Sequence, residues 1–188
     1  MDDIGLVDEG SWFFRAVVRR RVAWGFGAAA ALLVLACPTR GSVLLGLGPA
    51  LLGEALRTWA SATLVKNREL ATRGPYALVR NPLYLGSFLV GLGVAVMGGR
   101  PLLVALFVLG FVPVYGALAR KEEKRLLGRF GEAYRRYCRQ VPRFVPRLDR
   151  WPPPAAPLDL GRMWTVHREW RAWLGLYAAT LYLLVRAP

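Results

Sequence analysis

Histidine, cysteine and acidic residues are scarce in this 188-residue chain. His167 is its single histidine, Cys37 and Cys138 are its two cysteines, and 12 acidic residues stand against 26 Lys and Arg residues. One histidine, with no CxxC or HExxH motif and no carboxylate cluster, gives no reason to expect a metal site. The cysteines lie in different settings, one in an apolar run and one in a basic stretch, so no disulfide framework is predicted.

The shortage of acidic residues leaves a formal net charge of +14 in a chain that is 55% hydrophobic. Such a charge is typical of nucleic-acid-binding proteins, but a soluble domain could not hide long charge-free apolar runs. The two properties separate along the chain, which places apolar segments in lipid and arginines at an anionic membrane surface. The predicted fold class is an all-α integral membrane bundle with a cytoplasmic layer of loops and helix. Anionic lipid headgroups are expected partners, and nucleic acid is not.

About five transmembrane helices are expected from the apolar runs. They cover residues 22–37, 42–64, 83–97, 101–119 and 170–185. Several runs are close to the lower limit of about 17–25 residues for a spanning helix. The first run follows a basic stretch and reads as a retained signal-anchor helix rather than a cleaved signal. The turn Gly98–Pro101 predicts that the third and fourth runs form an antiparallel hairpin.

The distribution of Lys and Arg predicts how these helices are oriented. The basic segments are residues 15–21, 66–80 and 120–150, whereas the intervening turns carry only Arg40 and Arg100, with Arg186 at the far end. The positive-inside rule then puts the N-terminus in the cytoplasm and the C-terminus outside. Arginine outnumbers lysine and alanine is common, which is typical of a GC-rich bacterial genome and indicates the inner membrane.

The chain therefore divides into four parts. We expect a basic cytoplasmic N-terminus over 1–21, a membrane core over 22–150, a Pro-rich linker with an amphipathic segment over 151–169, and a C-terminal transmembrane helix over 170–188. The prolines within 151–157 predict a stiff, non-helical connection.

Two segments expected on the cytoplasmic side contain residues that the positive-inside rule does not explain. The first, residues 73–84, is predicted to be a rigid loop that presents arginines and tyrosines to an anionic ligand. Arginines and an aromatic belt at the membrane edge are the alternative, which leaves the prolines and Asn81 unexplained. The second, residues 120–146, continues the fourth run as a helix with Tyr134 and Tyr137 on one face, until Val141 and Pro142 end it. A solvated helix with paired surface charges is its alternative reading.

Glu54 and Arg57 lie three residues apart inside the second apolar run. A carboxylate at that depth should face the bundle interior with a partner, and Arg57 is the obvious one. The two residues, with Trp59, are either a structural pair and a membrane anchor or contacts to a substrate.

The segment GPYALVRNPLYLG over residues 74–86, a helical hairpin, Glu122–Glu123 and FGEAYRRYCRQVPRFVP over 130–146 follow one another. In this order and spacing they resemble the isoprenylcysteine carboxyl methyltransferase family, whose wider group includes phospholipid N-methyltransferases. The resemblance runs from Gly46 to Pro146. It implies S-adenosylmethionine as methyl donor, held between the loop and the segment after the helix. The implied catalytic residues are Arg80, Asn81, Glu122 and Glu123, and the implied cofactor-binding residues are Tyr76, Arg80, Pro82, Tyr84, Gly86, Glu122, Glu123, Tyr134, Tyr137, Val141 and Pro142.

Asn81 departs from the family pattern, in which histidine is frequent. An amide forms hydrogen bonds but does not shuttle protons near neutral pH, so the chain offers no obvious general base. A lipidic acceptor that needs no base, such as a carboxylate, is therefore favoured. An NADPH-dependent reductase of the sterol or steroid type and a non-enzymatic basic membrane scaffold remain as alternatives.

Overall fold

The computed structural model describes residues 27, 32, 34–64, 69–165 and 169–188, and the described part is built from helices. The α-helices are α3 (Arg40–Thr63), α4 (Pro82–Met97), α5 (Pro101–Phe130), α6 (Glu132–Gln140), α7 (Leu160–Thr165) and α8 (Trp170–Arg186), with short 3-10 turns η1 (Gly74–Ala77) and η2 (Leu148–Arg150). No strand occurs among the described residues. The all-α prediction is confirmed for this part of the chain.

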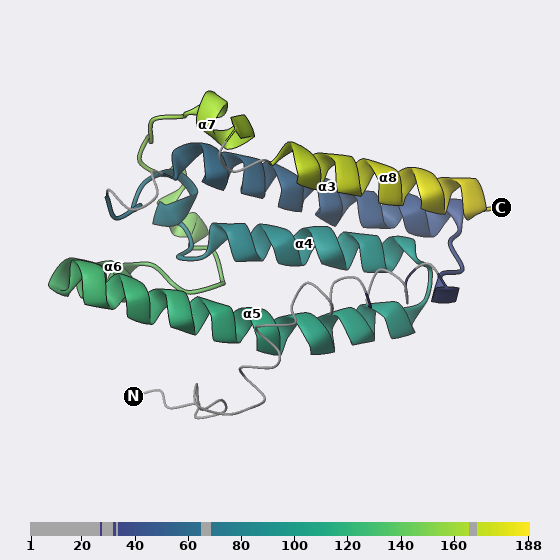
Figure 1. Cartoon of the computed structure of the whole chain (residues 1–188), viewed down its shortest axis with the longest axis horizontal. Helices are drawn as coiled ribbons and strands as arrows, with labels where there is room; N and C mark the ends of the chain where they lie inside the picture. Colours follow the sequence, from purple (N-terminus) through teal and green to yellow (C-terminus); the bar gives the residue numbers. More distant parts are fainter. Residues whose placement is uncertain (1–26, 28–31, 33, 65–68, 166–168) are drawn as a thin grey trace.

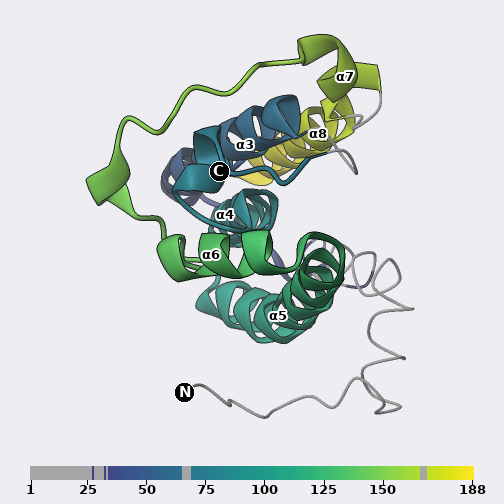
Figure 2. The same cartoon turned by 90° about the vertical axis from the view of Figure 1, so that its left-hand side faces the viewer.

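Helices α3, α4, α5 and α8 lie side by side and alternate in direction (Figures 1 and 2). The start of α3, the turn from α4 to α5 and the C-terminus share one end, and α6 lies at the other (Figure 1). This alternation is the one predicted from the basic segments. Most of the first predicted span, 22–37, lies outside the described residues.

Proline and glycine set the helix boundaries. Pro82 and Pro101 occupy the first positions of α4 and α5, where the missing N–H has no intrahelical partner to lose. The predicted continuation of α5 through residues 120–140 is interrupted at Gly131, whose φ of 51° lies in the left-handed region that favours glycine. The helix resumes as α6 and ends before Val141 and Pro142, as predicted.

One stretch of described helix, Pro101–Gln140, is long and apolar enough to cross a membrane by length and composition. Helix α4 is apolar but has only 16 residues. Among the described residues, helix length and composition therefore support one of the five expected spans.

Glycine allows α3 and α4 to approach closely. A Cβ atom at Gly93 would lie 2.5 Å from the Gly46 carbonyl oxygen, and one at Gly53 would lie 2.6 Å from the Gly86 carbonyl oxygen. Small residues at such contacts are typical of helix pairs in membranes, where close backbone packing replaces the hydrophobic effect.

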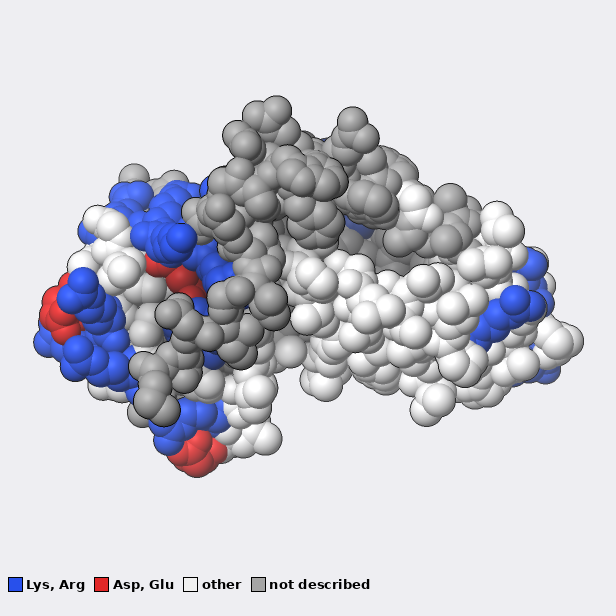
Figure 3. Space-filling model, turned by 90° about the horizontal axis from the view of Figure 1, so that it is seen from below, with Lys and Arg blue, Asp and Glu red and all other residues white. Residues whose placement is uncertain are grey.

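Charged side chains gather at one end of the molecule. On the face shown in Figure 3, Lys, Arg, Asp and Glu side chains crowd the end that carries α6, and a wide uncharged surface separates them from a few basic residues at the far end. Large apolar side chains are exposed on the outer faces of the long helices, among them Leu44, Leu52, Leu109, Leu174 and Leu181. An exposed apolar belt between two polar ends is the surface expected of a bundle in lipid.

Residues 142–159 form a segment without regular structure apart from η2, and we call this segment the strap. Its backbone is hydrogen-bonded to the loop before α4, from the Arg147 N–H to the Leu78 carbonyl at 3.0 Å and from the Gly74 N–H to the Pro154 carbonyl at 2.9 Å. Residues 151–157 are non-helical, as predicted, and the indole of Trp151 packs edge-on against that of Trp59 at 6.1 Å between ring centroids. The strap therefore joins α6 to the C-terminal end of α3.

Candidate functional site

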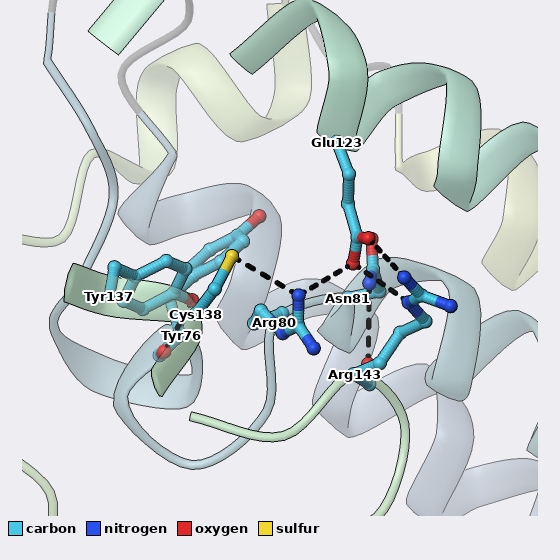
Figure 4. A network of polar contacts seen from close by, with 7 residues as sticks. All are labelled: Tyr76, Arg80, Asn81, Glu123, Tyr137, Cys138 and Arg143. Carbon is cyan, nitrogen blue, oxygen red and sulfur yellow. Dashed lines mark hydrogen bonds and ion pairs between the residues drawn. The ribbon is translucent and has the colours of Figure 1, made fainter. Parts of the chain in front are cut away.

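Two arginines, Arg80 and Arg143, hold the carboxylate of Glu123 (Figure 4). Arg143 donates to both oxygens of Glu123, from Nε at 3.0 Å and from Nη2 at 2.6 Å, and Arg80 Nη1 donates to the same carboxylate at 3.1 Å. The side chains of Glu123 and Arg80 are 12% and 15% exposed. Hydrogen bonds between a largely buried carboxylate and a fork of guanidinium donors are among the strongest in proteins, and this one raises the pKa of Arg143.

Three elements bring this cluster together. Glu123 extends from α5, Arg80 precedes the first turn of α4, and Arg143 belongs to the strap (Figure 4). The backbone fixes the last two, because the Arg80 N–H donates to the Pro142 carbonyl at 2.9 Å. The Asn81 amide donates to the Arg143 carbonyl at 3.3 Å, which ties the loop to the strap a second time.

Arg80 also contacts Cys138 on α6, with Nη1 donating to Sγ at 3.1 Å. The thiol is partly buried, so it forms one wall of the cluster rather than an open surface group. The same guanidinium thus connects α4, α5 and α6. Its Nε atom is buried and has no hydrogen-bond partner among the described residues.

Tyr134 and Tyr137 share the buried face of α6, as predicted, with 6.0 Å between ring centroids. The Tyr137 hydroxyl donates to the Tyr76 carbonyl at 2.7 Å. The Tyr76 hydroxyl is buried and has no hydrogen-bond partner in the described part of the chain. Burial raises the pKa of all three phenols, and the Glu123 carboxylate raises that of Tyr134 further. These hydroxyls therefore stay protonated near neutral pH.

A cavity of about 480 Å³ opens beside Glu123, which is within the range of about 300–1,000 Å³ typical of small-molecule sites. It is lined by Arg120, Glu123, Lys124, Leu127, Tyr134, Arg135, Cys138, Arg139 and Arg143. We call it the Glu123 cavity. Its chemistry fits the methyl donor implied by the sequence: a carboxylate for the ammonium group, arginines for the carboxylate, and a tyrosine for the adenine. The unpartnered Nε of Arg80 and hydroxyl of Tyr76 are buried, and neither residue lines this cavity.

The other implied cofactor residues do not all reach this cavity. Glu122 is on an exposed side of α5, where its side chain is 42% exposed and lies 3.6 Å from Arg125. Tyr84 packs edge-on against Tyr115 at 5.5 Å between centroids. A Cβ at Gly86 would lie 2.6 Å from the Arg57 Cγ, so this glycine serves the α3–α4 contact. The structure brings Arg80, Asn81, Glu123 and Tyr134 together and leaves Glu122 outside.

Glu54 and Arg57 form the predicted pair, with 3.6 Å between Oε2 and Nε. Arg57 also donates to Glu169 at 2.9 Å and to the Ser87 hydroxyl. The result is a buried link among α3, α4 and the start of α8, since Glu54 is fully buried and Glu169 is 6% exposed. These residues and Trp59 do not line the Glu123 cavity.

Arg143 is the main site residue that sequence reasoning missed, with Glu169 as the hidden partner of Arg57. Arg143 follows the helix-ending Val141–Pro142, but nothing in its local pattern distinguishes it from the other basic residues. In the described residues, no group of three or more His, Cys, Asp or Glu side chains is arranged to hold a metal ion.

The fold and the site are those of a helical membrane protein with a polar, arginine-rich cavity at its charged end. The family model described as phospholipid methyltransferase matches residues 41–133, from the start of α3 to the start of α6. The chain belongs to this phospholipid methyltransferase family, which includes proteins like the isoprenylcysteine methyltransferases, as the sequence predicted.

The curated relatives that this chain resembles are named for different functions. The chain is 35% identical over 131 residues to the cobalt-zinc-cadmium resistance protein CzcN of Cupriavidus metallidurans, which covers 66% of this chain and 56% of that protein. It is 35% identical over 83 residues to the protein-S-isoprenylcysteine O-methyltransferase of Schizosaccharomyces pombe, covering 44% and 35%. It is 32% identical over 93 residues to the Delta(14)-sterol reductase TM7SF2 of Mus musculus, covering 48% and 22%. The chain thus spans between about a fifth and just over half of these relatives' lengths. No solved structure matches the chain.

Proposed function

We propose that the protein transfers a methyl group from S-adenosylmethionine to a lipidic acceptor that enters from the bilayer. The observation that carries this proposal is the Glu123 cavity, which Glu123 and Arg143 of the strap line together. Arg80, which like Glu123 lies within the family match, holds the same carboxylate (Figure 4). The exposed apolar belt supports a place in the membrane, which we propose to be the inner membrane with the charged end in the cytoplasm.

In this proposal Glu123 takes the ammonium group of the donor, and the arginines around the cavity take its carboxylate. Bound there, S-adenosylmethionine supplies an electrophilic methyl group for in-line displacement. The chain then has to orient the acceptor and exclude water, which in well-aligned reactions lowers the barrier by about 7–11 kcal/mol. Arg80 and Arg143 hold Glu123 rigidly from two elements, so the cavity keeps its shape without the ligand.

The acceptor is proposed to be a carboxylate or another group that is nucleophilic without losing a proton. Asn81 stands where related proteins frequently carry histidine, and its amide is engaged by the Arg143 carbonyl. The phenols of Tyr76, Tyr134 and Tyr137 have raised pKa values, which makes them poor bases near neutral pH. An amine acceptor would need a base that these residues do not provide.

The test is transfer of isotopically labelled methyl groups to extracted membrane lipids, followed by mass spectrometry of the products. Native protein should give a labelled lipid, and Arg143→Gln should lower the yield by about tenfold or more through loss of its charge-assisted hydrogen bonds. Arg147→Gln is the matched control, because Arg147 lies on the same strap but pairs with exposed Asp149. Absence of label with folded native protein would contradict the proposal.

A sterol-type reductase is the second candidate, and the match to the Delta(14)-sterol reductase is the observation that favours it. NADPH carries phosphates that suit the cavity's arginines. Quenching of tryptophan fluorescence by NADPH, with none by the methyl donor, would reverse the order of the two proposals.

A further inference from the structure

A second cavity lies on the other side of α6, away from the Glu123 cluster. It has a volume of about 530 Å³ and lies between α6, the loop that contains η1, and the strap. The two cavities have different linings, and Tyr137 borders this one whereas Tyr134 borders the first. We call it the strap cavity.

Two arginines face the strap cavity from different elements. Arg73 comes from the loop before η1 and Arg136 comes from α6, and no carboxylate lines the space between them. The guanidinium groups of Arg73 and Arg136 have no hydrogen bond or ion pair within the described residues, although the Arg73 carbonyl accepts from the Tyr76 N–H at 3.2 Å. Other arginines at this end have carboxylate partners: Arg135 and Arg139 contact Glu132, Arg147 contacts Asp149, and Arg143 contacts Glu123. The strap cavity is therefore a place where positive charge is left unmatched.

The floor and the rim of this cavity have different chemistry. Ala77, Tyr137 and Val141 are buried and give an apolar floor. The Tyr137 hydroxyl is already committed to the Tyr76 carbonyl, so it presents ring surface rather than a donor. Thr72 and Gln140 add neutral hydrogen-bonding groups at the rim. The hydrogen bond from the Gly74 N–H to the Pro154 carbonyl holds the loop and the strap together as the wall.

We propose that the strap cavity binds a phosphate-bearing ligand, with Arg73 and Arg136 holding the phosphate and the apolar floor holding the adjoining carbon groups. A phosphate suits two arginines on separate walls, because its oxygens point in several directions and guanidinium groups bind them as a planar fork. The ligand is either an anionic phospholipid headgroup from the adjacent membrane surface or a soluble phosphate compound. This site is separate from the proposed methyl-donor site and does not depend on it.

The experiment uses the full chain in phosphatidylcholine nanodiscs and follows ³¹P line broadening of two probes, inorganic phosphate and dihexanoyl-phosphatidylglycerol. We expect the native protein to broaden the ³¹P line of a probe that binds. The double variant Arg73→Gln/Arg136→Gln should reduce this broadening by about tenfold or more, since each arginine supplies a charge-assisted contact. Arg125→Gln/Arg129→Gln is the control, because it removes the same charge from the same end but lines neither cavity.

Broadening of the phospholipid alone would identify a lipid headgroup, and broadening of both probes would identify the phosphate group itself; either result supports the proposal. Equal weakening by the control variant would show general surface charge and would overturn it. Loss of S-adenosylhomocysteine binding in the double variant would also overturn it, because the cavity would then belong to the methyl-donor site. If neither probe showed broadening, the proposal would also be overturned.

Discussion

At the residue scale, function depends on which charges are buried together. Glu123 is shared by Arg80 and Arg143, whereas Arg57 is shared by Glu54 and Glu169. The first arrangement has an excess of positive charge and borders a cavity. The second has an excess of carboxylate and is packed inside the bundle, which identifies it as a link between helices rather than an open site.

Replacement of Arg57 tests that reading. Arg57→Gln would leave the carboxylates of Glu54 and Glu169 buried without their shared partner, and breaking such a pair typically destabilises a protein by about 3–5 kcal/mol. We expect a lower thermal unfolding temperature in detergent. Arg40→Gln, at the exposed start of α3, is the control and should unfold like the native protein. Equal stability of the two variants would show that the buried link contributes nothing.

At the scale of the element, the pairing of α3 with α4 sets the position of Arg80 at the start of α4. Gly93→Ala would place a methyl group against the Gly46 carbonyl and the Ala50 side chain, at 2.5 Å and 2.7 Å. Overpacking of this kind destabilises by about 1–3 kcal/mol, which thermal unfolding in detergent can detect. Gly48→Ala, on α3 with open space around the new atom, is expected to be neutral. If the two variants behaved alike, the close approach of the helices would not matter for stability.

The sequence predicted these elements well because apolar runs, prolines and glycines are local signals. The hairpin of α4 and α5, the end of α6 at Val141 and the non-helical linker after Trp151 all follow from them. The break at Gly131 was missed, since one glycine in a long helical pattern is equally compatible with a continuous helix.

The helical phase of α5 beyond its apolar part could not be predicted. Glu122 and Glu123 are adjacent, and the apolar part of α5 has no polar face from which to decide which of them points inward. The structure selects Glu123, since the strap delivers Arg143 to it. That choice depends on a contact between residues far apart in the sequence, and the local pattern does not contain it.

At the scale of the whole molecule, charge and apolar surface divide along the long axis (Figure 3). The two cysteines mark opposite ends of this division. Cys37 is exposed near the turn between α4 and α5, where Arg100 donates to its sulfur at 2.9 Å, and Cys138 lies at the charged end. The proposed orientation puts Cys37 outside the cytoplasm and Cys138 inside it.

A membrane-impermeant maleimide can check this orientation in intact cells. The variant Cys138→Ser, which keeps only Cys37, should be labelled from outside. The variant Cys37→Ser, which keeps only Cys138, should be labelled only after the membrane is permeabilised, when the reagent reaches this partly buried thiol through the Glu123 cavity that it lines. The opposite pattern would place the charged end, and with it the Glu123 cavity, on the other side of the membrane.

The most direct test of the account is calorimetric titration of the purified protein with S-adenosylhomocysteine. We predict that native protein binds it, that Glu123→Gln binds about tenfold or more weakly because a charge-assisted contact to the ammonium group is lost, and that Glu122→Gln binds like the native protein. No binding by folded native protein, or equal weakening by both variants, would contradict the assignment of the Glu123 cavity to the methyl donor.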